Sequence, residues 1–171
     1  METWDAIVSR RNVRNFSDKT IPEADLRRIL EAGRRTPSAM NRQPWDFVVS
    51  TDLAHLVELA KCWPGAGHVA TSAATITVVT PIVDNDRDAA LNQYDLGQAS
   101  MTMMIAATDL GIGSAHAFVE DQDLARRILR FPDDRFAAYF ISLGYPADRP
   151  LTPIRKPTRR AFEDVVHDSA W

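Results

Sequence analysis

The first candidates for chemistry are arginines near the N-terminus. Arg10, Arg11 and Arg14 lie close together at the end of a short predicted helix. Guanidinium groups this close repel one another at low dielectric unless an anion lies between them, and arginine holds phosphate or carboxylate through paired hydrogen bonds. The alternative is that two of the three are simply solvated. The spacing favours a small anionic ligand that carries a phosphate group.

The C-terminal segment 147–171 is a second candidate. It is rich in proline and arginine and shows no core pattern, yet it carries Arg155, Lys156, Arg159 and Arg160. A segment that cannot bury a core of its own must be held by something else. We expect a partner subunit or a ligand phosphate to hold it.

A polar loop, Pro37–Trp45 with the sequence PSAMNRQPW, is the third candidate. Ser38, Asn41 and Gln43 offer donors and acceptors in an irregular segment directly before a predicted strand. Such groups can read the edge of a planar heterocycle. A polar loop without a ligand is the alternative.

Other chemistries find little support in the sequence. The four histidines are scattered without the paired spacing of a metal site, and Cys62, in an apolar helix, is expected in the core rather than as a nucleophile. Gly111–Ser114 follows a helix instead of a strand and lacks the full glycine pattern of a dinucleotide-binding turn. We find no nucleophile elbow and no phosphate-binding P-loop. We therefore predict no catalytic residue and no metal, but a bound cofactor.

Composition limits the class of protein. The chain has 171 residues, of which 45% are hydrophobic and 25% charged, values typical of one globular domain. A net charge of −3 argues against a nucleic-acid partner. No apolar run approaches the roughly 20 residues of a membrane span, and a single cysteine permits no internal disulfide. We expect a soluble cytoplasmic protein without a nucleic-acid or membrane partner.

Hydrophobic periodicity supplies the elements that would position these residues. It predicts helices and strands over the ranges 3–9 (helix), 20–35 (helix), 45–50 (strand), 51–62 (helix), 74–80 (strand), 87–110 (helix), 114–118 (strand), 121–130 (helix) and 136–143 (strand). Thr20–Glu23 has the pattern of a capping box, and Thr51 can cap the following helix. The helix 87–110 carries few charges after Asp95 and is expected to be buried on nearly all sides. This order predicts helices packed on a small sheet.

Five segments, taken in order, resemble the FMN-dependent nitroreductase family. Arg10–Phe16 (RRNVRNF) is similar to the family's R-R-S-x-R-x-F opening, and Pro37–Trp45 matches its P-S-x-x-N-x-Q-P-W loop. Asp95–Gly113 resembles its long central helix and the following turn. Leu143–Pro146 and Arg159–His167 resemble its closing strand and tail. The resemblance covers nearly the whole chain.

The resemblance implies an α+β protein with a small, mostly antiparallel central sheet flanked by helices. It implies one domain over residues 1–171, a homodimer with FMN at the dimer interface, and a tail, 147–171, wrapped on the partner subunit. It implies three groups of cofactor contacts. The phosphate and ribityl chain would contact Arg10, Arg11, Asn12 and Arg14, with Arg159 or Arg160 of the tail. The loop near the ring, partly across the interface, would contribute Pro37, Ser38, Ala39, Asn41 and Gln43, and Gly113 and Ser114 would lie against the ring face opposite the substrate.

The activity that the resemblance implies is transfer of hydride from NADH or NADPH to a small acceptor such as a nitroaromatic or a quinone. Arg10 or Arg14 would stabilise negative charge on the reduced flavin. Alternatives are a flavin-binding protein without turnover, a specialised family member that fragments flavin or removes halogen, and an interaction module with a vestigial site. A deazaflavin is a further alternative to FMN.

Two departures from the family pattern bear on specificity. Asn12 replaces the usual serine, which keeps a hydrogen-bonding group but changes its reach. The link Pro81–Asp88 is short and polar where many family members carry a longer insertion over the substrate. We expect an open site with broad acceptor use. The alternative is a cover supplied by Trp63, by the turn Cys62–His68 or by a partner segment.

Overall fold

The helices and strands follow one another in the order that the sequence predicts. The structure is a computed structural model that describes all residues, 1–171. The elements are α1 Thr3–Ser9, α2 Glu23–Arg34, β1 Asp46–Ser50, α3 Leu53–Leu59, β2 Ala74–Pro81, α4 Asp86–Asp109, β3 Gly113–Phe118, α5 Gln122–Leu129 and β4 Arg135–Gly144, with short 3-10 turns between some of them. None of these helices is long and apolar enough to cross a membrane.

The four strands form one sheet in the order β1-β2-β4-β3, and every neighbouring pair is antiparallel. The predicted α+β class with a small antiparallel sheet is confirmed. One irregularity lies between Val78 and Val79, where the partner on β4 jumps from Tyr139 to Ala137. This bulge inserts Ala138 as an extra residue and so changes which β4 side chains face each side of the sheet.

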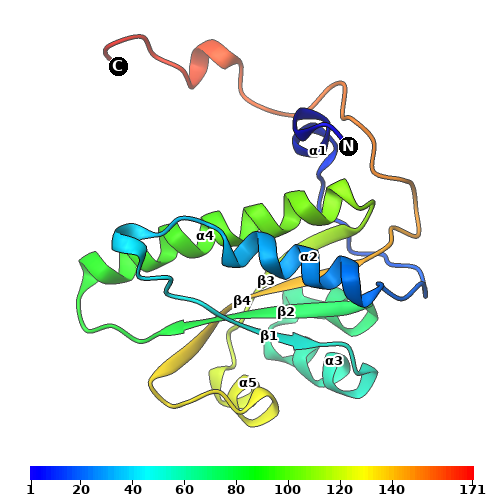
Figure 1. The fold of residues 1–171 in the computed structure, drawn as a ribbon, viewed down its shortest axis with the longest axis vertical. Coiled ribbons are helices and arrows are strands. Elements are labelled where there is room, and N and C mark those ends of the chain that lie inside the picture. The colour runs from blue at the N-terminus through cyan, green and yellow to red at the C-terminus, as the bar shows by residue number, and fades with distance from the viewer.

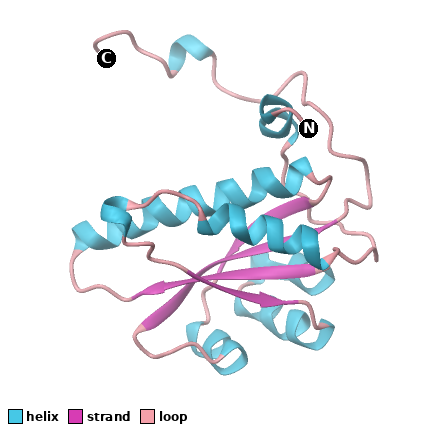
Figure 2. Ribbon diagram, viewed as in Figure 1, coloured by secondary structure: helices cyan, strands magenta, loops and turns pink.

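Helices cover both faces of the sheet (Figures 1 and 2). α2 and α4 pack on one face, where Ile29, Leu96 and Met103 join strand residues such as Ile76 and Ile141 in the larger apolar core. α3 and α5 lie on the other face, around Leu56, Leu59 and Phe140. The alternation of side chains along each strand supplies both cores.

The predicted helix caps are wrong at two positions. Pro22 is the N-cap of α2, in an extended conformation and without a side-chain hydrogen bond. Thr20 lies two residues before Pro22 and does not cap the helix. At α3 the carboxylate of Asp52, not Thr51, accepts from the amide of His55 at 3.0 Å. A carboxylate there also has a favourable interaction with the positive end of the helix dipole.

The prediction that the central helix is buried on nearly all sides is also wrong for the single chain. α4 buries one side on the sheet and another on α2, but Tyr94 is 69% exposed and Met101 is 44% exposed. Two neighbouring layers cannot surround a helix. An apolar stripe therefore remains uncovered on α4.

The N-terminal segment after α1 docks against the end of β3. Asn12 bridges Ser114 in parallel, and the amide of Val13 donates to the Ser114 carbonyl at 2.9 Å. Glycine makes this approach possible, because a Cβ on Gly113 would lie 2.6 Å from Val13. The close packing fixes the position of the arginines on either side of Val13.

The C-terminal tail divides into two parts. Its first part follows the N-terminal segment: the amide of Ala147 donates to the Asn15 carbonyl, Leu151 is buried, and the amide of Ile154 donates to the Val8 carbonyl, both bonds at 3.0 Å. Residues 155–171 are all exposed. In Figure 1 they run past α1 and away from the body of the molecule.

Candidate functional site

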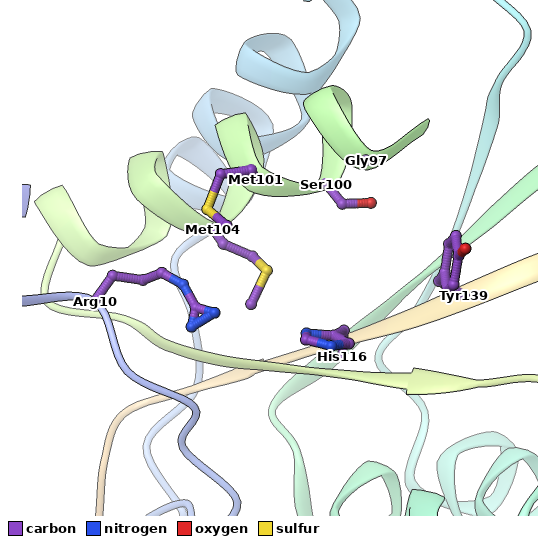
Figure 3. Close-up of a pocket in the computed structure, with 7 residues that line it drawn as sticks. All are labelled: Arg10, Gly97, Ser100, Met101, Met104, His116 and Tyr139. Carbon is purple, nitrogen blue, oxygen red and sulfur yellow. The ribbon is translucent and has the colours of Figure 1, made fainter. Parts of the chain in front are cut away.

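A cavity of about 270 Å³ lies between α4, the sheet and the N-terminal segment. Its lining residues are Arg10, Gly97, Ser100, Met101, Met104, His116 and Tyr139. Figure 3 shows Arg10 and Met104 on one side, Tyr139 on the other, and His116 between them. The cavity thus has a cationic end and a wall formed by methionine side chains.

Secondary structure explains why these side chains converge. Along β3 every second residue faces α4, which directs Ser114, His116 and Phe118 to that side. On β4 the bulge at Ala138 leaves Tyr139 on the same side, packed at the margin of the core beneath α4. Arg10 follows the last residue of α1 directly.

Arg10 and Arg14 carry charge that no carboxylate compensates. Neither is among the ion pairs of the structure. Both terminal nitrogens of Arg10 donate to Asn12 Oδ1, at 3.0 and 3.2 Å. Burial, and then repulsion by Arg159, lower the pKa of Arg10. An anion would relieve this repulsion, as the spacing of the arginines predicts.

Two histidines experience the same positive field. Burial is the main cause that lowers the pKa of His116, followed by the charges of Arg10 and Arg14. Burial, Arg14 and His116 lower the pKa of His68 to about 4. His68 Nδ1 lies 2.9 Å from Ser142 Oγ, and its Nε2 is buried without a partner. Histidines that are scattered in the sequence are therefore neighbours in the fold.

Several buried polar atoms around the cavity have no hydrogen-bond partner. Arg10 Nε and Ser100 Oγ belong to residues that line the cavity, and Ser9 Oγ and Ser114 Oγ belong to residues next to the lining in the chain or the strand. A buried polar group without a partner costs about 1–3 kcal/mol, so such groups seldom cluster without a reason. Their donor and acceptor capacity, next to guanidinium groups that lack a carboxylate partner, fits the phosphate and polar chain of a cofactor such as FMN.

Not every predicted contact faces the cavity. Arg11 is paired with Asp148 at 2.7 Å and also donates to the Arg149 carbonyl at 2.9 Å. In the tail, Arg159 donates to the Thr158 carbonyl at 2.7 Å and Arg160 donates to the Asp164 carbonyl. Of these three arginines, only Arg159 acts on the pKa of Arg10.

The predicted loop lies elsewhere along α4. The amide of Ala39 donates to Asp95 Oδ2 at 3.0 Å, and Ser38 Oγ accepts from the amide of Gln43 at 2.9 Å. Met40, Asn41 and Gln43 have positive φ angles between 50° and 54°, and all three are exposed. Pro37 borders an open hollow on the exposed side of α4 together with Tyr94 and Met101. None of the loop residues lines the cavity of its own chain.

A second cavity of about 380 Å³ adjoins the first one at Tyr139. Phe118, Phe136 and Ile82 supply most of its aromatic and aliphatic surface, and no charged residue lines it. Phe118 and Tyr139 meet edge to face with ring centroids 5.9 Å apart. This hollow suits an uncharged, flat molecule.

Among the lining residues sequence reasoning identified only Arg10 and missed Gly97, Ser100, Met101, Met104, His116 and Tyr139. A usable signal existed for His116, because it lies two residues beyond Ser114 in a strand and so shares its face. No sequence signal indicated the bulge that directs Tyr139. The expectation that Cys62 belongs to the core is confirmed: it is 1% exposed, and burial raises its pKa to about 11.

Two of the three alternative covers, Trp63 and the turn Cys62–His68, do not lie over this cavity, whereas a partner segment stays a prediction. Cys62 and Trp63 pack in the core around α3 and α5, on the opposite face of the sheet. The link between β2 and α4 comprises only residues 82–85. Its Ile82 borders the apolar hollow rather than closing it.

Fold and cavity together define a class: an α+β protein with a small antiparallel sheet and a partly apolar cavity that has a cationic end. The model of the nitroreductase family matches residues 7–64. A protein of Archaeoglobus fulgidus with the provisional name NADH dehydrogenase/NAD(P)H nitroreductase is 30% identical, over 96% of both chains. The NADH dehydrogenase of Thermus thermophilus is 28% identical over 91% of this chain and 92% of its own length.

A solved structure has the same fold. The FMN-dependent nitroreductase of Clostridium difficile R20291 superimposes with a TM-score of 0.84 at 21% identity, and the match covers 97% of this chain and 99% of that one. The chain belongs to the nitroreductase family. The family predicted from the five motifs is thereby confirmed.

Proposed function

We propose that this protein is an FMN-dependent oxidoreductase that passes electrons from NADH or NADPH to small aromatic acceptors such as quinones and nitroaromatics. One observation carries the proposal: Arg10 lines the cavity without a carboxylate partner, and two buried polar atoms of the lining, Arg10 Nε and Ser100 Oγ, have no hydrogen-bond partner. Arg14, in the same N-terminal segment, has no carboxylate partner either. The names of the relatives support it, since they mention NADH, NAD(P)H and FMN. Bound FMN would supply the hydride-transfer chemistry.

The residues of this chain would bind and orient the reactants. Arg10 and Arg14 would hold the phosphate, with Asn12 fixing the Arg10 guanidinium through its 3.0 and 3.2 Å hydrogen bonds. Met101 and Met104 would border the flat ring system. The apolar hollow at Phe118 and Tyr139 would take the acceptor beside it.

The protein would act as a single-domain homodimer. Tyr94 and Met101 on α4, Trp4 and Ile7 on α1, and the tail residues Phe162, Val165, Val166 and Trp171 are large and exposed. Exposed apolar residues in such numbers mark an interface. The tail, with no contacts to a core of its own beyond Ile154, would wrap on the partner subunit. The loop with Asn41 and Gln43, which points away from its own cavity, would reach the cofactor of the partner.

Anaerobic spectroscopy tests the proposal. The purified protein, loaded with FMN and freed of excess, should show the absorption of oxidised flavin, and that absorption should bleach on addition of NADH or NADPH. A quinone should then restore it. A flavin spectrum that neither pyridine nucleotide bleaches would contradict an oxidoreductase and favour flavin binding without turnover. A protein that does not bind FMN would contradict the proposal entirely.

Acceptor use should be broad, because only residues 82–85 link β2 to α4. Apolar contacts discriminate by about 1–3 kcal/mol per missing group. Initial rates on a panel of quinones and nitroaromatics should therefore differ by less than about a thousand-fold, or about 4 kcal/mol, and oxygen should also be reduced. A single strongly preferred acceptor without oxygen consumption would indicate a closed, specialised site.

A further inference from the structure

The apolar hollow that would take the acceptor contains three polar side chains. Gln93 comes from α4, Tyr139 from β4, and Gln122 from the start of α5. All the other lining residues are apolar: Ile82, Phe118, Val119, Phe136, Ala137 and Ala138. A molecule bound in this hollow can therefore form side-chain hydrogen bonds only with the three polar residues.

Gln122 has no donor left for a ligand. Its Nε2 donates to the carbonyls of Val119 and Ala137, both at 2.8 Å, and its Oε1 accepts from the amide of Ala137 at 2.9 Å. A primary amide has two hydrogens, and both are used here. The role of Gln122 is to fix the backbone beside the hollow.

The hydroxyl group of Tyr139 orients the side-chain amide of Gln93. It donates to Gln93 Oε1 at 2.6 Å and thereby uses the only hydrogen of the phenol. Phe118 holds the Tyr139 ring in turn, edge to face with ring centroids 5.9 Å apart. Because the phenol holds Oε1, the Nε2 of the same planar amide is directed away from it.

Gln93 Nε2 donates to no group of the protein, since the bond to Tyr139 is the only one that the side chain of Gln93 forms. It is the one side-chain donor of the hollow that remains available to a ligand. Gln93 is exposed, so water can reach this donor. An oxygen of a ligand that takes the place of water keeps a hydrogen bond there, whereas an apolar group loses it.

The bond to Tyr139 also places this donor at the boundary between the two cavities. Tyr139 lines the cavity proposed for the cofactor (Figure 3) as well as the apolar hollow, whereas Gln93 lines only the hollow of these two. A ligand whose oxygen is bonded to Nε2 therefore keeps its ring in the hollow and next to the cofactor.

We infer that Gln93 is a specificity-determining residue whose Nε2 donates a hydrogen bond to an oxygen of the acceptor. The inference rests on the proposed function and on its placement of the acceptor in the apolar hollow. It defines the class of acceptor more closely, as uncharged aromatic molecules that carry a carbonyl or nitro oxygen. The apolar walls bind the ring, and Gln93 selects the rings that carry such an oxygen.

Two ligands of the same shape test the hydrogen bond without turnover. Acetophenone has a carbonyl oxygen where α-methylstyrene has a methylene group. Each is titrated into oxidised, FMN-loaded protein, and ligand-observed NMR gives the dissociation constant. Gln93→Met should weaken acetophenone about five- to ten-fold, as expected for an ordinary hydrogen bond, and leave α-methylstyrene unchanged. Equal changes for both ligands, or none for either, would overturn the inference.

A second variant separates donation to the ligand from support of Tyr139. Gln93→Glu keeps an oxygen that accepts from the Tyr139 hydroxyl but presents an oxygen to the ligand instead of an N–H group. It should weaken acetophenone at least as much as Gln93→Met does. Acetophenone binding retained in Gln93→Glu but lost in Gln93→Met would show that Gln93 only supports Tyr139, and would overturn the inference.

Ala90→Glu is the matched control for the added charge. Ala90 is exposed on α4, one helical turn before Gln93, and lines neither cavity. This variant should bind both ligands as the unaltered protein does. A loss of acetophenone binding in Ala90→Glu equal to that in Gln93→Glu would assign the effect to charge alone and contradict donation by Gln93.

Reoxidation of the flavin links the hydrogen bond to the proposed function. Protein reduced with NADH is mixed anaerobically with subsaturating benzoquinone or with ferricyanide, which has no oxygen. Gln93→Met should slow benzoquinone about five- to ten-fold and leave ferricyanide unchanged. If NADH bleaches both proteins and benzoquinone reoxidises them equally fast, the inference alone fails. If neither pyridine nucleotide bleaches the unaltered protein, the proposed function fails and the inference falls with it.

Discussion

The N-terminal segment and the loop 37–43 are both polar and both were predicted to bind one cofactor, yet they are positioned differently. The N-terminal segment is docked against β3 through the Asn12–Ser114 bridge and directs Arg10 into the cavity of its own chain. The loop is fixed to α4 through Asp95 and presents Asn41 and Gln43 to the outside.

The difference supports the proposal that each site is assembled from two copies of the chain. Residues with positive φ that are not glycine are uncommon and cost about 1–3 kcal/mol each. Met40, Asn41 and Gln43 all adopt such angles. Strain of this kind persists where it serves a function, and a loop directed away from its own cavity can serve the cavity of a partner.

The largest effect should come from undocking the N-terminal segment. Gly113→Ala places a Cβ 2.6 Å from Val13, and overpacking of this kind costs about 1–3 kcal/mol. Because Arg10 and Asn12 would move with Val13, FMN affinity should also fall more than about ten-fold. Urea unfolding and fluorescence titration with FMN measure the two effects. Gly67→Ala, whose Cβ meets open space, is the matched control; similar results for both variants would contradict the docking.

Removal of single arginines should separate the charges without a carboxylate partner, those of Arg10 and Arg14, from the paired charge of Arg11. Arg10→Ala and Arg14→Ala should each weaken FMN binding by about 1.5–3 kcal/mol, the contribution of a charged hydrogen bond. Arg11→Ala should weaken it less, because Asp148 engages that guanidinium at 2.7 Å. Equal losses for all three variants in a binding titration would show that the cluster acts as a whole.

Acid should destabilise the fold through His68, which is buried in the 3-10 turn Pro64–Thr71 next to Ser142 of β4. Its pKa is lowered from 6.5 to about 4, so below pH 6.5 the unfolded chain binds a proton that the folded chain does not. The free energy of unfolding should fall by about 2 kcal/mol between pH 7 and pH 5 from this group. His68→Gln should remove that part of the pH dependence. If the free energy of unfolding of His68→Gln fell with pH as steeply as that of the unaltered protein, this role of His68 would be contradicted.

The smallest effect should come from loosening the loop. Asp95→Asn replaces a charge-assisted hydrogen bond to the amide of Ala39 by a neutral one, a loss of about 1 kcal/mol. Amide hydrogen exchange at Ala39 should accelerate, and FMN affinity should fall several-fold. Asp86→Asn, at the exposed start of α4, is the control. Unaltered exchange at Ala39 would show that Asp95 does not hold the loop.

Most of the fold could be predicted because the signals are local. The β-branched run of β2 and the apolar stripe of α2 fixed their types and their limits to within a few residues. The caps were mistaken, since Asp52 competes with Thr51 for the same amides and only backbone geometry decides between them. The exposed face of α4 could not be foreseen, because composition does not say how many layers surround a helix.

The site was predictable only in part. Three neighbouring arginines indicated an anion, but the ion pair between Arg11 and Asp148 joins residues far apart in sequence and could not be anticipated. His116 and Tyr139 reach the cavity through strand pairing and a bulge, both properties of the folded chain. Sequence motifs thus indicated the ligand, while the tertiary structure determined which residues face it.

Mixed dimers test most directly the claim that two copies build each site. One chain carries Arg10→Ala with Arg14→Ala, the other Asn41→Ala with Gln43→Ala, and different affinity tags isolate the mixed dimer. In that dimer one cavity is doubly impaired and the other combines intact arginines with an intact loop. We expect one tightly bound FMN per mixed dimer and weak binding in each parent. If both sets of residues served the cavity of their own chain, every site in the mixed dimer would stay impaired. The absence of tight FMN binding in the mixed dimer would therefore contradict the account.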